Sequence, residues 1–261
     1  MTTPKSLTQF TSDRKASNKK TLVTYITAGL PGWLEAVHAC YENGADIVEI
    51  GLPFSDPIMD GPVIAHASAL ALKEGAHTLD LLETISQETF AGPCAVMTYT
   101  NVLYVHGVKE IVTALSDANI TGLILPDLTF EQSNLFSDAL IDSDISLIQL
   151  VSSTTNARRR ADIMKSCEGF LYCVAIKGIT GQNIDLASIF TNFIGDIQRE
   201  SPVPTYCGVG VRTPSDAAAL SSLSDGVIVG TSLVEKMIDQ PHGAKDVAAL
   251  VRDIRDAIDA K

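Results

Sequence analysis

Two acidic side chains, Glu49 and Asp60, have the sequence surroundings of an acid–base pair. Glu49 interrupts an apolar run, Ile47-Val48-Glu49-Ile50-Gly51, and burial of an unpaired carboxylate in such a run raises its pKa toward neutrality. Asp60 follows a proline-containing loop and precedes Gly61-Pro62, which fixes the backbone beside it. A structural ion pair at Glu49 and a turn or helix cap at Asp60 are the alternatives. Two carboxylates at one site suit general acid–base catalysis.

Three glycine-bearing turns indicate a phosphate site. They are Gly178-Ile179-Thr180-Gly181, Gly208-Val209-Gly210 and Gly230-Thr231-Ser232. Backbone N–H groups in such turns, helped by a hydroxyl at a helix start, bind phosphate without a lysine. Adjacent turns of this kind predict a phosphorylated small molecule as the ligand.

Apolar and aromatic residues near the ends of β-branched runs are candidates for a slot that holds a flat ring. They are Tyr25, Met97, Tyr99, Ile124 and Tyr172, each of which is alternatively plain core. The five histidines are scattered without metal-ligand spacing, so no metal site is expected. Lys177 follows the sixth run, where a lysine can form a Schiff base, although a solvent-facing loop lysine is the default interpretation.

The charge balance excludes several classes of partner. Nineteen Lys and Arg against 31 Asp and Glu give a formal net charge of −12, which repels nucleic acids and anionic membrane surfaces. The five cysteines are widely spaced and form no Cys-x-x-Cys pair, which favours reduced thiols and a cytoplasmic location. The N-terminal residues lack the apolar core of a signal peptide, and no apolar stretch is long enough to span a membrane.

Short β-branched runs alternate along the chain with amphipathic stretches, an order that indicates parallel strands. Eight such runs are predicted as strands, at residues 22–26, 47–51, 94–99, 122–125, 146–151, 170–175, 203–207 and 226–229. Helices are predicted among others at residues 33–43, 79–89, 108–118, 131–142, 158–167, 215–223 and 245–260.

Eight strand–helix units in 261 residues predict an α/β fold, a single-domain (β/α)8 TIM barrel over residues 1–261, with a doubly wound open sheet as the alternative. Residues 1–20 form an N-terminal extension in which residues 6–17 are expected to be an extra helix over the barrel floor. Thr213-Pro214 has the residue types of a helix start, a Thr N-cap followed by Pro at the first helical position.

The segment from Glu49 to Pro62, Glu-Ile-Gly-Leu-Pro-Phe-Ser-Asp-Pro-Ile-Met-Asp-Gly-Pro, closely resembles the signature of the tryptophan synthase alpha chain family. The resemblance continues through residues 25–31, 96–101, 125–133, 169–181, 204–211 and 225–234, and so covers nearly the whole chain. It implies a lyase that cleaves indole-3-glycerol phosphate to indole and glyceraldehyde 3-phosphate, without a cofactor in this chain.

The resemblance also implies roles for individual residues. Asp60 would take the indole N1 proton, and Glu49 would move protons between the C3 carbon and the glycerol hydroxyl. Thr180 would bond Asp60, and Tyr172 would help to place the catalytic groups. The phosphate would be surrounded by Gly181, Gly208, Gly210, Gly230 and Thr231.

The family works with a pyridoxal-phosphate beta chain as an α2β2 heterotetramer, with contacts that include Pro53, Asp56 and the Asp127 region. This chain departs from the family pattern at secondary positions: Thr129 and Ser153 replace frequent prolines, Ile176-Lys177 is unusual, and Thr231-Ser232 replaces Ser-Ala. A stand-alone indole-releasing lyase, a Schiff-base aldolase and an inert regulatory barrel subunit are the competing interpretations.

Overall fold

A closed barrel of parallel strands forms the centre of the molecule. The computed structural model describes residues 6–174, 186–208, 210–238 and 243–260. Within these residues, the barrel order is β1-β2-β3-β4-β5-β6-β7-β8, with β8 pairing back to β1. The strands span Thr21–Thr27, Ile47–Gly51, Cys94–Met97, Gly122–Ile124, Ser146–Ser152, Leu171–Val174, Thr205–Gly208 and Gly226–Val229. The predicted barrel is confirmed, and the open-sheet alternative is excluded.

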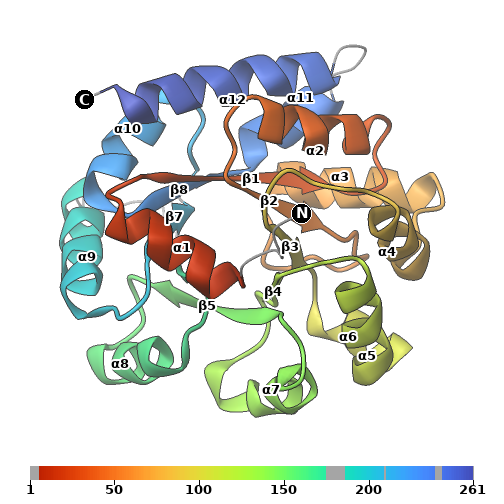
Figure 1. Cartoon of the computed structure of the whole chain (residues 1–261), viewed down its shortest axis with the longest axis horizontal. Coiled ribbons are helices and arrows are strands. Elements are labelled where there is room, and N and C mark those ends of the chain that lie inside the picture. The colour runs from red at the N-terminus through yellow and green to blue at the C-terminus, as the bar shows by residue number, and fades with distance from the viewer. Residues whose placement is uncertain (1–5, 175–185, 209, 239–242, 261) are drawn as a thin grey trace.

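Helices surround the barrel on its outside (Figure 1). They are α1 (Leu7–Ala16), α2 (Trp33–Glu42), α3 (Pro62–Lys73), α4 (Thr78–Ser86), α5 (Thr100–His106), α6 (Val108–Asp117), the 3-10 turn η1 (Phe130–Gln132), α7 (Asn134–Leu140), α8 (Ala157–Ser166), α9 (Leu186–Glu200), α10 (Pro214–Leu223), α11 (Thr231–Ile238) and α12 (Gly243–Asp259). None of these described helices combines the length and apolar character that crossing a bilayer requires.

The barrel interior is filled by alternate residues of the strands. The lower layer, at the amino ends of the strands, packs with Leu7 of α1. It holds Val23, Ile47, Ala95, Ile124, Ile148, Phe170, Tyr206 and Ile228. Side chains on a strand point the same way every second residue. Tyr25, Glu49 and Tyr172 therefore face the barrel interior two positions beyond members of this layer, toward the carboxyl ends of the strands.

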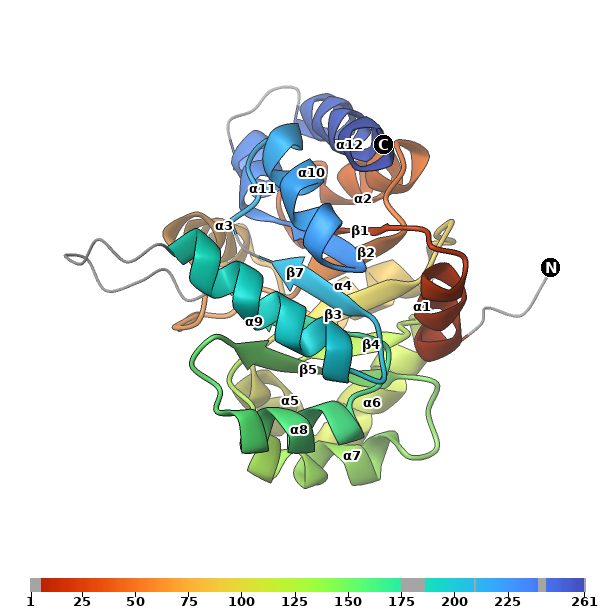
Figure 2. The same cartoon turned by 90° about the vertical axis from the view of Figure 1, so that its left-hand side faces the viewer.

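The N-terminal helix α1 covers the amino end of the barrel, as the sequence predicted (Figure 2). Leu7 is fully buried, and Thr11 donates its hydroxyl hydrogen to the carbonyl of Gly169 at the start of β6. The Thr8 hydroxyl accepts the N–H of Gly169 at 2.8 Å. The floor of the barrel is thus closed, and the opposite end is free to hold the site.

The predicted start of α10 is confirmed in detail. Thr213 is the N-cap, Pro214 stands in the first turn, and the Thr213 and Asp216 side chains each accept a backbone N–H in a reciprocal capping box. Such an arrangement satisfies two N–H groups that the first helical turn leaves without a partner. It also fixes the direction in which the chain leaves the turn after β7.

Candidate active site

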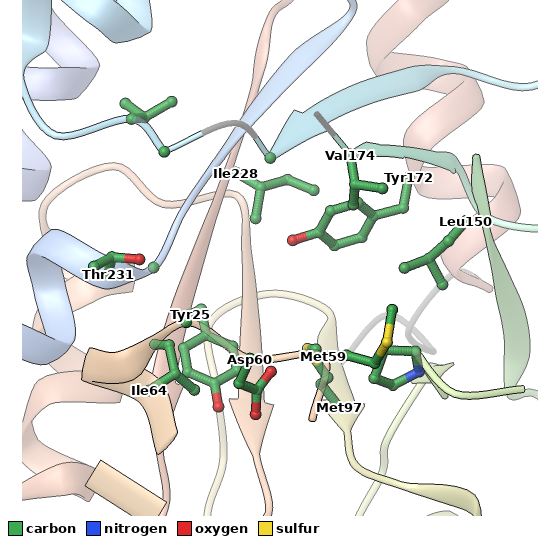
Figure 3. A pocket seen from close by; sticks show the side chains of 16 residues that line it. Tyr25, Met59, Asp60, Ile64, Met97, Leu150, Tyr172, Val174, Ile228 and Thr231 are labelled. Atoms are coloured by element: carbon green, nitrogen blue, oxygen red, sulfur yellow. The ribbon is translucent and has the colours of Figure 1, made fainter. Parts of the chain in front are cut away.

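A cavity of about 420 Å³ opens at the carboxyl ends of the strands (Figure 3). Its lining contains side chains or backbone from β1, β3, β5, β6, β7 and β8, from the loops after β2, β4, β7 and β8, and from the starts of α3 and α11. The lining residues are Tyr25, Met59, Asp60, Gly61, Ile64, Met97, Pro126, Leu150, Tyr172, Val174, Gly208, Gly210, Val211, Ile228, Gly230 and Thr231. In a (β/α)8 barrel this end is where catalytic groups are placed.

Glu49 lies in the middle of β2, with no exposed surface. It pairs with Tyr25 of β1 and Ala95 of β3 in the strand register, and among the described residues neither of its carboxylate oxygens has a hydrogen-bond partner. Burial, and then the charge of Asp60, raises the pKa of Glu49 from 4.5 to about 8. Glu49 is therefore mostly protonated at neutral pH, and the alternative of a structural ion pair finds no support in the described residues.

Asp60 ends the loop after β2 and points into the cavity beside Tyr25 (Figure 3). Its backbone N–H donates to the carbonyl of Pro57 at 3.0 Å, and α3 begins two residues later. Burial raises the pKa of Asp60 from 3.8 to about 6, while hydrogen bonding from the Tyr99 hydroxyl opposes this rise. Asp60 is therefore mostly ionised at neutral pH, in contrast to Glu49.

Tyr25 and Tyr172 line the cavity, and each phenol is close enough to both acids to feel their charge. Burial is the main cause that raises the pKa of each phenol, and the charges of both Glu49 and Asp60 raise these pKa values further. Both rings lie against glycine: a Cβ on Gly51 would clash with the Tyr25 hydroxyl, and a Cβ on Gly208 would lie 2.6 Å from the Tyr172 ring. These glycines leave the space that the phenols occupy.

The glycine turns after β7 and β8 meet at one side of the same cavity. Gly208, Gly210, Gly230 and Thr231 are all part of its lining, and Gly210 has a φ of +57°, a conformation that favours glycine. The Ser232 hydroxyl donates to the carbonyl of Val211 at 3.3 Å, which ties the two turns together. No lysine or arginine is part of the described lining, so an anion here would be held by backbone N–H groups and the Thr231 hydroxyl.

Of the five residues considered for an aromatic slot, the structure places three in the lining and two elsewhere. Tyr25, Met97 and Tyr172 line the cavity. Ile124 packs in the lower interior layer, and Tyr99 lies behind the loop that carries Asp60. Both are buried, and their positions at strand ends do not bring them to the cavity surface.

Several lining residues were not singled out from the sequence. Leu150 and Ile228 come from β5 and β8, and Ile64 comes from the first turn of α3. Leu150 follows the interior residue Ile148 by two positions, so strict alternation along β5 would have identified it. Val174 follows Tyr172 by two positions along β6 and carries the same signal, whereas Pro126 lies beyond the end of β4, where the alternation of a strand no longer applies.

The remaining predicted residues lie on the rim or outside the described chain. Pro53 is buried and Asp56 is exposed, both in the loop after β2. Asp127 accepts the backbone N–H of Thr100 at 3.0 Å and its hydroxyl hydrogen at 2.6 Å, and thereby caps α5. Lys177, Thr180 and Gly181 lie outside the described residues. Within the described part, no group of three His, Cys, Asp or Glu side chains is placed to hold a metal ion.

The combination of two carboxylates with different pKa values and two joined glycine turns agrees with the comparisons to known proteins. The model of the tryptophan synthase alpha chain family matches residues 11–259. The chain belongs to the tryptophan synthase alpha chain family. A curated alpha chain from Streptococcus pneumoniae (strain ATCC 700669 / Spain 23F-1) is 38% identical over 239 residues, which cover 90% of this chain and 93% of that protein.

Solved structures of tryptophan synthase support the same assignment. The alpha subunit from Legionella pneumophila str. Paris is 30% identical with a TM-score of 0.88, and the match covers 98% of this chain and 98% of that one. A chain in a Mycobacterium tuberculosis tryptophan synthase structure is 31% identical with a TM-score of 0.88, covering 99% of this chain and all of that one. The alpha chain structures therefore share the barrel fold with this chain over nearly the whole length of the chain.

Proposed function

We propose that Glu49 and Asp60 carry the proton transfers of the alpha reaction in this chain. The alpha reaction is the cleavage of indole-3-glycerol phosphate to indole and glyceraldehyde 3-phosphate, and the chain is a lyase for this step of L-tryptophan biosynthesis. The observation that carries the assignment of roles is the difference between the two acids. With pKa values of about 8 and about 6, Glu49 holds its proton at neutral pH while Asp60 has lost its own.

The proton balance of the reaction fits these two states. The protonated Glu49 gives a proton to C3 of the indole while Asp60 accepts the proton of N1, which produces the indolenine tautomer. The Glu49 carboxylate then takes the proton of the glycerol hydroxyl next to C3. The bond between C3 and that carbon breaks, its electron pair restores the aromatic ring, and N1 regains its proton from Asp60. Both acids end in their starting states, and the products are indole and the aldehyde.

The cavity lining supports the binding part of the proposal. The backbone at Gly208, Gly210 and Gly230 and the Thr231 hydroxyl would hold the phosphate, with Gly181 contributing from outside the described residues. Tyr25 and Met97 would contact the indole ring, and Tyr172 would keep the catalytic groups in place. Thr180 would bond Asp60 from its loop. None of these steps requires a metal or a cofactor in this chain.

Family membership implies a beta chain as partner, and we propose an α2β2 assembly in which pyridoxal phosphate belongs to the beta chain. Asp56 is exposed on the rim loop and is the freest of the three predicted contact residues, since Pro53 is buried and Asp127 is bonded to Thr100. We also propose that residues 1–261 act as one domain. The free, buried state of all five cysteines supports a reducing cytoplasmic location.

The test is indole release from indole-3-glycerol phosphate by the purified chain, alone and with a tryptophan synthase beta chain. Slow cleavage that the beta chain accelerates is expected, whereas fast cleavage without it would support a stand-alone lyase. Glu49→Gln and Asp60→Asn should each lower kcat by at least ~10²-fold. Unchanged turnover in both variants would refute the proposed mechanism.

A further inference from the structure

Tyr99 lies behind the loop that carries Asp60 and contacts that loop near both of its ends. The residue follows β3 and is only 4% exposed. Its ring stacks on Phe54, with centroids 4.9 Å apart and planes 26° apart. Its hydroxyl accepts the backbone N–H of Met59 at 3.0 Å. One side chain therefore holds both the beginning and the end of the loop.

The loop between these two contacts has little other support. The backbone bonds within the loop are short-range, from the N–H of Ile58 to the carbonyl of Asp56 at 2.8 Å and from the N–H of Asp60 to the carbonyl of Pro57 at 3.0 Å, and Ile58 is 82% exposed. Apolar side chains this exposed contribute no core packing. The position of the loop thus depends on the stacking of Phe54 and on the hydroxyl of Tyr99.

Tyr99 is itself held firmly. It stands at the N-cap position of α5, and the next residue, Thr100, makes three hydrogen bonds to the Asp127 carboxylate, with donor–acceptor distances of 3.0, 3.2 and 2.6 Å. The backbone N–H of Thr98 donates to the carbonyl of Ile124 at 3.1 Å. A side chain mounted on a braced segment can position a loop that has few contacts of its own.

We propose that Tyr99 is a positioning residue for Asp60: its hydroxyl fixes the loop through the N–H of Met59 and donates to the Asp60 carboxylate. This inference rests on the proposed function, since it assigns Tyr99 to the acid that accepts the N1 proton. It differs from the sequence-based expectation that Tyr99 contacts the indole ring. The hydroxyl works through Asp60 and does not need to touch the substrate.

The electrostatic surroundings of Asp60 give the hydroxyl a measurable effect. Other titratable groups face this carboxylate from the barrel: Tyr25 of β1, Glu49 of β2 and Tyr172 of β6, with Asp127 beyond Tyr99. Burial raises the pKa of Asp60, and in the described residues hydrogen bonding from Tyr99 is what lowers it. Removal of the hydroxyl should therefore raise the pKa of Asp60 and leave less of the ionised base near neutral pH.

The test is the pH profile of kcat for indole release by Tyr99→Phe, which keeps the ring and its stacking on Phe54. A hydrogen bond to a charged group is worth roughly one pKa unit or more, so the acidic limb of the profile should move up by about one pH unit. The loss of kcat should be about tenfold on the acidic limb and clearly smaller near pH 8. KM should change little, because the hydroxyl does not contact the substrate.

Tyr41→Phe is the matched control. The Tyr41 ring stacks on Phe90 with centroids 5.9 Å apart, and its hydroxyl donates to the carbonyl of Pro93 at 2.8 Å, away from the cavity. This variant removes the same atom and should leave the acidic limb in place. A limb that does not move in Tyr99→Phe, or that moves equally in Tyr41→Phe, would overturn the inference.

Asp60→Asn separates this inference from the proposed function. If Asp60→Asn keeps wild-type turnover, the proposed function fails whatever Tyr99→Phe does. If Asp60→Asn loses turnover and Tyr99→Phe behaves as the wild type, only the positioning role fails. In the Asp60→Asn background, Tyr99→Phe should cause little further loss of kcat, since its effect passes through the carboxylate.

Discussion

At the scale of single residues, the proposed site contains two carboxylates of similar chemistry in different surroundings. Glu49 has no exposed surface and no hydrogen-bond partner among the described residues, whereas Asp60 is half-buried and the Tyr99 hydroxyl lowers its pKa. Burial disfavours the charged form of an acid, and hydrogen bonding to the charged form favours it. These two effects separate the pKa values, and no lysine or arginine belongs to the described lining.

The burial of Glu49 predicts that Glu49→Gln is more stable than the wild type while it is much less active. The folded pKa of Glu49, about 8, exceeds its ordinary value of 4.5, so the folded state loses stability as the pH rises between these two values. Gln mimics the protonated acid and avoids this loss, which amounts to about 3 kcal/mol at pH 7. Thermal unfolding should show a difference in Tm that is small at pH 5 and widens toward pH 8.

Glu74→Gln on the exposed end of α3 provides the control for that measurement, and its Tm should follow the wild type at every pH. A Tm difference for Glu49→Gln that stays constant with pH would show that Glu49 ionises in the folded protein as easily as in the unfolded chain.

Residue type and position in the sequence were enough to single out Glu49 and Asp60 as candidate acids. They did not predict which way the neighbouring side chains point. Glu49 was recognisable because a charge inside an apolar strand is costly, and Asp60 because of its fixed backbone. Tyr99 was expected at the indole ring, since a tyrosine after a strand looks the same in sequence whether it faces the cavity or the back of a loop. That difference depends on Phe54 and Met59, which contact Tyr99 from 45 and 40 positions away along the chain.

At the scale of elements, α1 shows how a helix with little amphipathic character acquires a defined place. Leu7 is the buried apolar side chain of this helix, and its methyl group lies where a Cβ on Gly122 or Gly169 would be, at 2.8 and 3.1 Å. The two glycines at the starts of β4 and β6 thus form a socket for Leu7. Thr8 and Thr11 add hydrogen bonds to Gly169 on the same side.

This packing predicts that Leu7→Ala destabilises the protein by about 3 kcal/mol through the cavity it leaves. The site lies at the other end of the barrel, so kcat for indole release should stay near the wild-type value. Urea unfolding and the indole assay measure the two effects. Ser12→Ala on the exposed side of α1 is the control and should change stability by less than ~0.5 kcal/mol. An equal, small effect of both substitutions would mean that α1 does not close the barrel.

Strands were predictable from the sequence because buried parallel strands are short, β-branched and separated by helical stretches. The third strand was predicted to end at residue 99 and ends at Met97, since Thr98 and Tyr99 turn toward α5. The helices α3, α5, α9 and α11 were not among those that the sequence analysis specified. The helices α5 and α11 have only 7 and 8 residues, too few to show a helical period clearly, and a local sequence pattern does not reveal the tertiary hydrogen bonds of Thr100 and Ser232.

At the scale of the whole molecule, the first and last helices meet on one half-buried carboxylate at the amino end of the barrel. Asp46 accepts the backbone N–H of Leu22 in β1 at 2.8 Å. Arg14 of α1 lies 2.7 Å from one of its oxygens, and Arg255 of α12 lies 3.2 Å from the other. Burial raises the pKa of Asp46, and the hydrogen bond and the two arginines oppose this rise. The first and last helices are thereby joined through a residue that belongs to neither.

The final prediction concerns this junction. Asp46→Ala should destabilise the folded chain by about 3 kcal/mol, because it leaves two mostly buried arginines without their shared anion. Glu131→Ala removes the partner of Arg159 in an exposed pair and should cost less than ~1 kcal/mol. Asp46→Asn should fall between them, since the amide oxygen still accepts the N–H of Leu22. Equal losses of stability in Asp46→Ala and Glu131→Ala, measured by urea unfolding, would show that the ends of the chain are held by apolar packing and not by Asp46.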